Sequence, residues 1–358
     1  MKKVISVLLL LSLCIGSIYS QNKKDRQLID RVASWQIENH SKSKHNKLDW
    51  TNGALYRGMV EWAYYTDNQR YFDFLLNIGD KHNWSLLPRV YHADDLAVGQ
   101  TYIRLYEKYK NEKMIEAVKE RLDSIAGNPS KAQLWLGAKR WSDRWSWCDA
   151  LFMAPPVYTL FYNIHSEQKY LDFMDKEYQE CVDSLYSKEQ HLFYRDQRYI
   201  SKREKNGANV FWGRGNGWVF GGLPFILNDL SESHPRYSFY LNLYREMADA
   251  VVDCQDKKGS WHASLLDPAS YPSPENSASS FFVYGLAWGV NKGILQDAKY
   301  KKAIKNGWKA LKSYVDKEGK LGYVQPVGAA PEDVTSDMTD VYGVGAFLLA
   351  GVEMQKVK

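Results

Sequence analysis

Two places in this chain bring carboxyl groups to positions where they could exchange a proton with a sugar. Asp149 follows two tryptophans, Trp145 and Trp147, and directly precedes an apolar segment. Asp94 and Asp95 precede another apolar segment in the same way, earlier in the chain. An apolar wall or a second carboxylate raises the pKa of a carboxyl group, which makes it a general acid near neutral pH. The sequence therefore predicts an acid/base pair of Asp149 with Asp95 or Asp94, and leaves that last choice open.

The same carboxylates have a structural alternative. Aspartate is common at the N-terminus of a helix because its side chain accepts hydrogen bonds from the free N–H groups of the first turn. Asp149 and one of Asp94 and Asp95 could act as such caps. Their equivalent places in neighbouring repeats favour the acid/base pair instead.

Residues 211–218 combine three glycines with an arginine between two tryptophans. Glycine lets the backbone come close to a ligand, and the planar guanidinium of Arg214 suits a carboxylate. Trp212 and Trp218 would form the walls of a pocket. The alternative is a glycine-rich helix entry with a structural arginine. A phosphate-binding loop is excluded, because no strand precedes the segment and no Lys-Ser/Thr follows it.

Further binding candidates share a place in the loops that precede apolar segments. Aromatic residues make up 14% of the chain, and aromatic rings line sugar sites as well as hydrophobic cores. A lone histidine is more often structural than a ligand, so each of these residues has a packing alternative. The candidates for stacking on or hydrogen-bonding to a sugar are Trp50, Asn52, His92, Trp145, Trp147, Trp261, His262 and Ser277.

The elements that position these residues form a repeat. Five times, an apolar segment rich in small residues is followed by a short polar break and a second amphipathic segment. A leading helix over residues 25–40 and one closing helix bring the expected helices to twelve. Alternating helices in this number predict an all-α (α/α)6 barrel, with the polar and aromatic residues at one end. The first segments are expected to start near Asn52, Asp94, Asp149, Gly217, Ser279 and Asp340, with small hairpins near residues 192–194 and 322–324.

Composition narrows the class of protein. Apolar residues make up 45% of the chain, which excludes wholesale disorder. The net charge of +5 is spread without long basic runs, which argues against a nucleic-acid partner. Cys148, Cys181 and Cys254 form neither a disulfide framework nor a C-x-x-C metal motif, so no metal and no cofactor is expected.

The first twenty residues are predicted to be a targeting segment. Lys2 and Lys3 precede a short apolar stretch that is too short to span a membrane, which is typical of a secretory signal. We expect export to the periplasm or the medium, without stable membrane insertion. A lipid anchor at Cys14 is disfavoured because Leu13 is too large for the usual motif. Residues 21–358 are expected to form a single catalytic domain, whose oligomeric state the sequence does not determine.

With these residues in view, the chain resembles the unsaturated glycuronyl hydrolases, specifically family 105 of the glycoside hydrolases. The resemblance spans most of the chain after residue 20, and that family has an (α/α)6 barrel. The motifs that carry it, in the family's order, are Trp50-x-Asn52-Gly53, His92-Ala93-Asp94-Asp95, Trp145-x-Trp147-Cys148-Asp149, Trp212-x-Arg214-Gly215-Asn216-Gly217-Trp218 and Glu275-Asn276-Ser277.

The resemblance implies an unusual glycosidase reaction. Members of the family act on an anionic oligosaccharide whose terminal uronic acid carries a C4=C5 double bond, left by a polysaccharide lyase. Asp149 matches the catalytic acid, which protonates C4 before water adds at C5. Asp95 or Asp94 matches the assisting carboxylate, and Arg214 would hold the uronate between Trp147, Trp212 and Trp218.

The chain departs from the family pattern after residue 194. Many relatives have a histidine there, whereas this chain continues with Arg195 and Asp196. We therefore hypothesise that Arg195 meets a second anionic group, such as a sulfate on the neighbouring sugar. That would suit rhamnose-3-sulfate chains of the ulvan type better than plain rhamnogalacturonan.

Two other classes of function compete with this reading. One is another (α/α)6 glycosidase or a sugar epimerase; epimerases of this shape rely on paired histidines, and none of the 8 histidines repeats at the starts of the inner helices. The other is an exported carbohydrate-binding protein without catalytic activity. Such a protein would not need Asp149, a second carboxylate and Arg214 together.

Overall fold

Each repeat of the sequence folds into one inner and one outer helix of a ring. The computed structural model describes residues 22–135 and 137–357, so the predicted signal segment 1–20 and Cys14 lie outside the described residues. In this described part, the inner helices are α2 (Trp50–Thr66), α4 (Gly99–Tyr109), α7 (Pro155–His165), α9 (Gly213–Asp229), α11 (Asn276–Asn291) and α13 (Val341–Lys356). The outer helices are residues 22–39, α3 (Gln69–Lys81), α5 (Glu116–Gly127), α8 (Gln168–Leu185), α10 (Tyr237–Asp253) and α12 (Ala298–Ser313).

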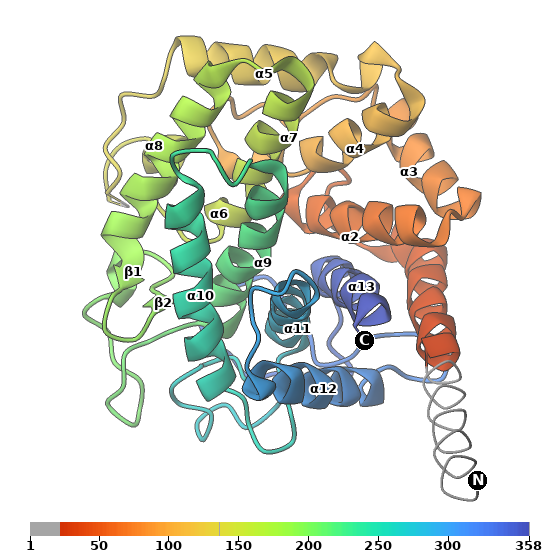
Figure 1. Cartoon of the computed structure of the whole chain (residues 1–358), viewed down its shortest axis with the longest axis vertical. Helices are drawn as coiled ribbons and strands as arrows, with labels where there is room; N and C mark the ends of the chain where they lie inside the picture. The colour runs from red at the N-terminus through yellow and green to blue at the C-terminus, as the bar shows by residue number, and fades with distance from the viewer. Residues whose placement is uncertain (1–21, 136, 358) are drawn as a thin grey trace, which may run out of the picture.

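The inner helices close into a ring. Along the chain, α2 packs on α4, α4 on α7, α7 on α9, α9 on α11 and α11 on α13, and α13 returns to pack on α2. Figure 1 shows this closure, with the first and last inner helices side by side. The predicted (α/α)6 barrel is thereby confirmed.

The two rings follow from two kinds of helix sequence. Nearly every residue of α9 and α11 is buried, because these inner helices are surrounded by protein on all sides. Outer helices such as α3 and α12 bury only one apolar face and expose charged residues on the other. The inner ring is therefore also the core of the molecule.

Glycines let α2 and α13 close the ring. A Cβ atom at Gly58 would overlap the carbonyl oxygen of Gly345, and a Cβ atom at Gly345 would overlap that of Ala54. The backbones of the two helices therefore approach more closely than any side chain would allow.

The helix boundaries differ from those expected at two places. The helix expected near Asp94 starts at Gly99, because a 3-10 turn over Ala93–Leu96 comes first. The segment expected as one helix after Asp149 divides into α6 (Ala150–Met153) and α7, since Pro155 and Pro156 lack the N–H groups that would continue α6.

The hairpin near residues 192–194 is confirmed as strands β1 (Tyr186–Ser187) and β2 (Leu192–Phe193). Near 322–324 the pairing is shorter: an antiparallel bridge joins Val315 and Leu321, and the N–H of Gly322 donates to the carbonyl of Tyr314.

No helix in the described ranges is long and apolar enough to cross a membrane.

Candidate functional site

Asp149 stands at the start of α6 with a carboxylate that does not cap the helix. Its side chain makes no hydrogen bond to the backbone N–H groups of the first turn, although it occupies the N-cap position. It accepts a weak hydrogen bond from the Cys148 thiol at 3.5 Å and lies 3.6 Å from Nε of Arg195. Burial raises the pKa of Asp149, and the charges of Arg195 and Arg214 oppose that rise. The capping alternative is therefore not what the structure shows.

Asp94 and Asp95 lie in different surroundings. Burial and then the negative charge of Asp149 raise the pKa of Asp94 to about 8, so that Asp94 keeps its proton at neutral pH. Asp95 is fully buried and accepts hydrogen bonds from the backbone N–H and the guanidinium of Arg89. Neither aspartate caps α4; the Nδ1 atom of His92 caps the 3-10 turn instead, by accepting from the N–H of Asp94.

Arg195 reaches Asp149 because two distant segments pair. The N–H of Cys148 donates to the carbonyl of Arg195, and Trp147 forms a bridge with Asp196. The guanidinium of Arg195 then lies between the carboxylates of Asp149 and Asp196, with Nη1 at 2.8 Å from Asp196 Oδ2. The proposed sulfate contact of Arg195 would have to compete with these two carboxylates.

His92 and Trp147 form one aromatic wall beside the carboxylates. Their ring centroids are 5.0 Å apart, and Trp141 packs on the other side of Trp147 at 5.7 Å. Burial and the nearby Arg89 charge lower the pKa of His92 to about 4, so this imidazole is neutral at neutral pH. A neutral His92 can accept the hydrogen bond from Asp94 described above and still offer its second nitrogen to a ligand.

Arg214 is fully buried and holds a loop of the chain. Its two terminal nitrogens donate to the carbonyl oxygens of Gln325 and Pro326, at 2.5 and 2.8 Å. The guanidinium also lies over the rings of Trp212 and Tyr342, 4.4 and 4.9 Å from their centroids. Arg214 therefore has the structural role that the sequence offered as an alternative, because it holds the loop at Gln325 and Pro326. Its charge also acts on Asp149 through space and opposes the rise in the pKa of that carboxyl group.

Trp50, Trp218 and Tyr342 pack together at the same end of the barrel. The ring of Trp50 lies 5.3 Å from Tyr342 and 5.8 Å from Trp218. Of these three, only Trp50 is partly exposed. Trp50 is thus the member of the cluster that a sugar could reach.

Five predicted binding residues are instead built into the protein interior. Trp145 packs against Tyr158 and Phe173, and the Nε1 atom of Trp261 donates to the carbonyl of Val251. Ser277 donates to Glu275, which caps α11. The remaining two, Asn52 and His262, are buried and bonded to His40 and Asn46, and to Asp256, Tyr271 and Ser273, respectively.

The structure adds residues that the sequence analysis missed. Arg89 pairs with Asp95, and Asp49 has a pKa raised by burial and, in smaller part, by the charge of Asp95. Asp49 and Tyr342 stand at the starts of α2 and α13, so comparison of equivalent repeat positions could have found both. Arg89 lies in a loop with no repeat signal.

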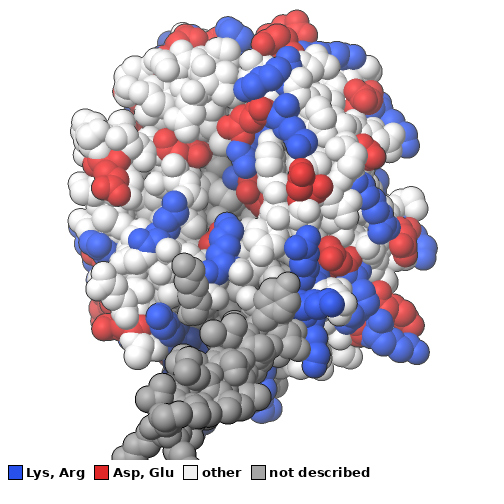
Figure 2. Space-filling model, turned by 45° about the vertical axis from the view of Figure 1, so that its right-hand side comes forward, with Lys and Arg blue, Asp and Glu red and all other residues white. Residues whose placement is uncertain are grey.

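Charged side chains of both signs are intermixed on the face shown in Figure 2, without one dominant patch. Over the described residues, no group of three or more His, Cys, Asp or Glu side chains could hold a metal ion.

Comparison with known proteins places this chain in a family. The sequence profile of Glycosyl Hydrolase Family 88 matches residues 28–358. An unsaturated 3S-rhamnoglycuronyl hydrolase from Alteromonas sp. (strain LOR) is 37% identical, over 92% of this chain and 85% of its own. A protein of the same name from Formosa agariphila is 38% identical, over 98% of both chains. The solved structure of a family 88 glycosyl hydrolase from Bacteroides vulgatus matches with a TM-score of 0.84 and 27% identity, over 94% of this chain and 99% of that one.

Proposed function

Because the chain belongs to Glycosyl Hydrolase Family 88, we propose that it removes a 4,5-unsaturated uronic acid from the non-reducing end of lyase-generated oligosaccharides. The sugar next to that uronic acid is proposed to be rhamnose 3-sulfate. The observation that carries this proposal is the likeness, over most of the length of each chain, to two relatives named unsaturated 3S-rhamnoglycuronyl hydrolase. The carboxyl pair of Asp94 and Asp149 supports the same reaction, because it provides a proton in a buried setting.

The reaction proceeds by hydration of the double bond. Asp149 donates a proton to C4 of the enol ether. The oxygen of a water molecule then bonds to C5, and this water loses a proton to the carboxylate of Asp149, which restores its protonated form. The hemiketal formed at C5 opens to a ketone by cleavage of its bond to the ring oxygen. The hemiacetal left at C1 then collapses to an aldehyde and releases the remaining oligosaccharide as an alcohol. One water is consumed in each cycle.

Asp94 is the assisting carboxyl in this proposal. Its proton stays bound up to about pH 8, so the pair as a whole enters the reaction with a proton at neutral pH. Asp95 serves the site indirectly, by holding Arg89 and the loop before the 3-10 turn. Trp50, which is partly exposed, supplies a surface on which the unsaturated sugar rests, and the buried rings of His92 and Trp147 form the wall beside the carboxyl groups.

The test uses the ultraviolet absorbance of the conjugated uronic acid, which disappears when the double bond is hydrated. The wild-type protein should remove the absorbance of a sulfated uronyl-rhamnose disaccharide faster than that of its desulfated form or of a rhamnogalacturonan lyase product. Asp149→Asn should lose at least about a hundredfold in rate while its circular dichroism stays that of the wild type. No decay on any lyase product would overturn the proposal.

Asp95→Asn is the matched comparison for Asp94→Asn. If Asp94 assists catalysis, Asp94→Asn lowers kcat without loss of the fold. Asp95→Asn should mainly lower the melting temperature, since it removes a buried partner of Arg89. The reverse pattern would assign the assisting role to Asp95.

We further propose that residues 1–20 are a secretory signal and that the mature enzyme works outside the cytoplasm. Polymeric substrates and their lyase products arise there. N-terminal sequencing of protein recovered from the periplasm or the medium should show a start near Gln21, whereas retention of Met1 would contradict export through this segment.

A further inference from the structure

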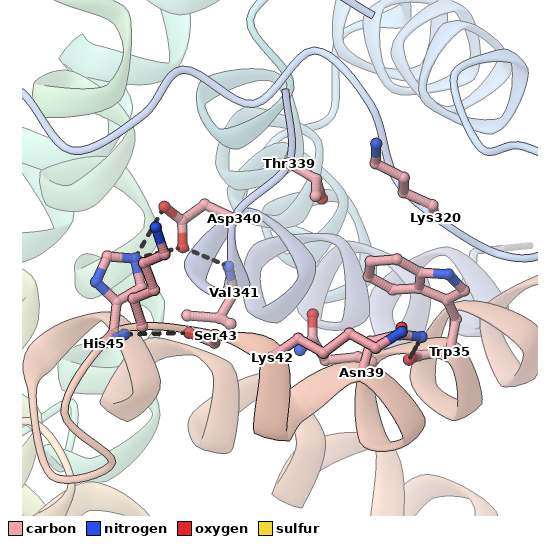
Figure 3. A pocket seen from close by; sticks show the side chains of 11 residues that line it. Trp35, Asn39, Lys42, Ser43, His45, Lys320, Thr339, Asp340 and Val341 are labelled. Carbon is pink, nitrogen blue, oxygen red and sulfur yellow. Dashed lines mark hydrogen bonds and ion pairs between the residues drawn. The ribbon is translucent and has the colours of Figure 1, made fainter. Parts of the chain in front are cut away.

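A cavity of about 480 Å³ lies on the rim of the barrel, away from the carboxyl pair. It is lined by the end of the first outer helix, by residues 42–45 and by the segment that leads into α13. We refer to it as the Trp35 cavity. Figure 3 shows the indole of Trp35 at one side with Lys320 above it, the His45–Asp340 pair at the other side, and Lys42 between the two sides.

The lining is basic. It contains Lys42, Lys44 and Lys320 but only one carboxylate, that of Asp340. Asp340 is already occupied, since it accepts hydrogen bonds from His45 and from the N–H of Val341. The cavity therefore has at least two uncompensated positive charges.

The lysines keep free donors. The ammonium group of Lys42 donates to Asn39 Oδ1 and that of Lys320 to the carbonyl of Asp337, which leaves each with further N–H groups. Lys44 forms no hydrogen bond or ion pair with any described residue. The hydroxyl of Thr339, another lining residue, is buried without a hydrogen-bond partner. Ammonium groups and a hydroxyl around a partly exposed indole match a sugar that carries an anionic group.

The cavity lies at the end of the barrel where the inner helices begin, as the carboxyl pair does. Asp340 and Val341 line it at the start of α13, and the next residue, Tyr342, packs on Trp50 and beneath Arg214. His45, another lining residue, is close enough to Asp49 for its charge to lower the pKa of that carboxyl group. The charge of Asp49 in turn contributes to the raised pKa of Asp94. A chain of sugars that starts at the carboxyl pair could therefore extend over this part of the rim.

We propose that the Trp35 cavity is a distal subsite that binds a sulfate- or carboxylate-bearing sugar of the same oligosaccharide. This inference rests on the proposed function, because it supplies the oligosaccharide. The cavity shares no lining residue with the carboxyl pair, so a disaccharide bound for cleavage leaves it empty. Its contribution appears only with longer substrates.

The experiment compares chain lengths. The double variant Lys44→Gln/Lys320→Gln is assayed on unsaturated sulfated di-, tetra- and hexasaccharides, and Trp35→Ala in parallel. We expect KM for the longer substrates to rise by about tenfold or more, from the loss of charge-assisted hydrogen bonds, while kcat and the disaccharide kinetics stay unchanged. Lys113→Gln, which changes an exposed lysine of a distant outer segment, is the control.

The change in KM with chain length and with sulfation decides whether the cavity is a subsite and which anionic group it recognises. A longer-chain effect that disappears on desulfated substrates assigns sulfate as the recognised group, and one that persists assigns the uronate. Unchanged KM for every length, or an equal rise for the disaccharide, overturns the subsite.

A separate binding measurement tests the cavity even if the proposed hydrolysis does not occur. If no lyase product is hydrolysed, titration calorimetry with a saturated sulfated tetrasaccharide still compares wild type and the double variant. Loss of binding in the variant then supports the cavity as an anionic-sugar site, whereas equal binding, or binding of inorganic sulfate alone, overturns it.

Discussion

Loss of hydration raises the pKa of both Asp149, which is buried, and Asp94, which is partly buried, but their surroundings act on that rise differently. Two guanidinium charges, of Arg195 and Arg214, oppose the rise in the pKa of Asp149. Asp94 has the negative charge of Asp149 as its second-largest influence, which adds to the effect of burial. The pair therefore holds a proton in a range where isolated aspartates, with a pKa of 3.8, are fully ionised.

The rate should consequently fall as the pH rises through about 8. The proton on Asp94 is present below its folded-state pKa of about 8 and is lost above it, so the protonated pair is the active form. The profile of kcat/KM against pH measures this alkaline limb. In Asp94→Asn, the limb near pH 8 should disappear or move; an unchanged limb would show that another group controls it.

The same shift has a consequence for stability. Since the folded pKa of Asp94 lies above the unfolded value, the folded state binds more protons between pH 4 and 8, and stability decreases as the pH rises through this window. Asp94→Asn should therefore melt at a higher temperature than the wild type at pH 8, with little difference at pH 4. Equal melting temperatures at both pH values would contradict the assignment of a buried, raised carboxyl.

Arg195 is expected to position Asp149 and to keep its pKa from rising further. Arg195→Ala should lower kcat by about tenfold or more on sulfated and desulfated substrates alike, since one pKa unit corresponds to a factor of ten. Arg198→Gln is the control, because Arg198 also bonds to Asp196 but is largely exposed and makes no contact with Asp149. A loss confined to sulfated substrates would instead support the hypothesis that Arg195 binds sulfate.

At the scale of the element, the backbones of α2 and α13 are in close contact at Gly58 and Gly345. Gly345→Ala should destabilise the protein by about 1–3 kcal/mol, because the new Cβ atom has no space beside the Ala54 carbonyl and the helices must move apart. Gly127→Ala is the matched control, since its Cβ atom would meet nothing within 4 Å at the end of α5. Denaturant unfolding should show that the control is unchanged or slightly stabilised.

The helices were predictable from sequence because burial leaves a periodic pattern, whereas side-chain partners were not. Glu61 in α2, for example, pairs with Arg57 and Arg104 and is only partly exposed. The sequence does not reveal such a pairing in full, since one of the two partners, Arg104, comes from the neighbouring helix α4. Asp149 was predictable from its place at a helix start, but its contact with Arg195 depends on a pairing between segments almost fifty residues apart.

At the scale of the whole molecule, the last helix completes both the fold and the catalytic end. α13 packs against α2 and α11, buries most of its own surface, and carries Tyr342, which contacts Trp50 and Arg214. The ring therefore differs from an open array of repeats, in which a terminal helix has one neighbour and its loss leaves the remaining repeats folded. Here its removal would break two helix interfaces and expose the apolar interior of the barrel.

A chain truncated after Thr339, which lacks α13, should accordingly lose cooperative unfolding altogether. We expect far-ultraviolet circular dichroism to retain part of the helical signal, while the dye ANS binds to the exposed interior and calorimetry shows no sharp transition. A truncation after Val357, which removes only the final residue, is the control. If the chain without α13 still melted cooperatively, the barrel would be stabilised repeat by repeat, and closure would matter for the position of Tyr342 rather than for the fold.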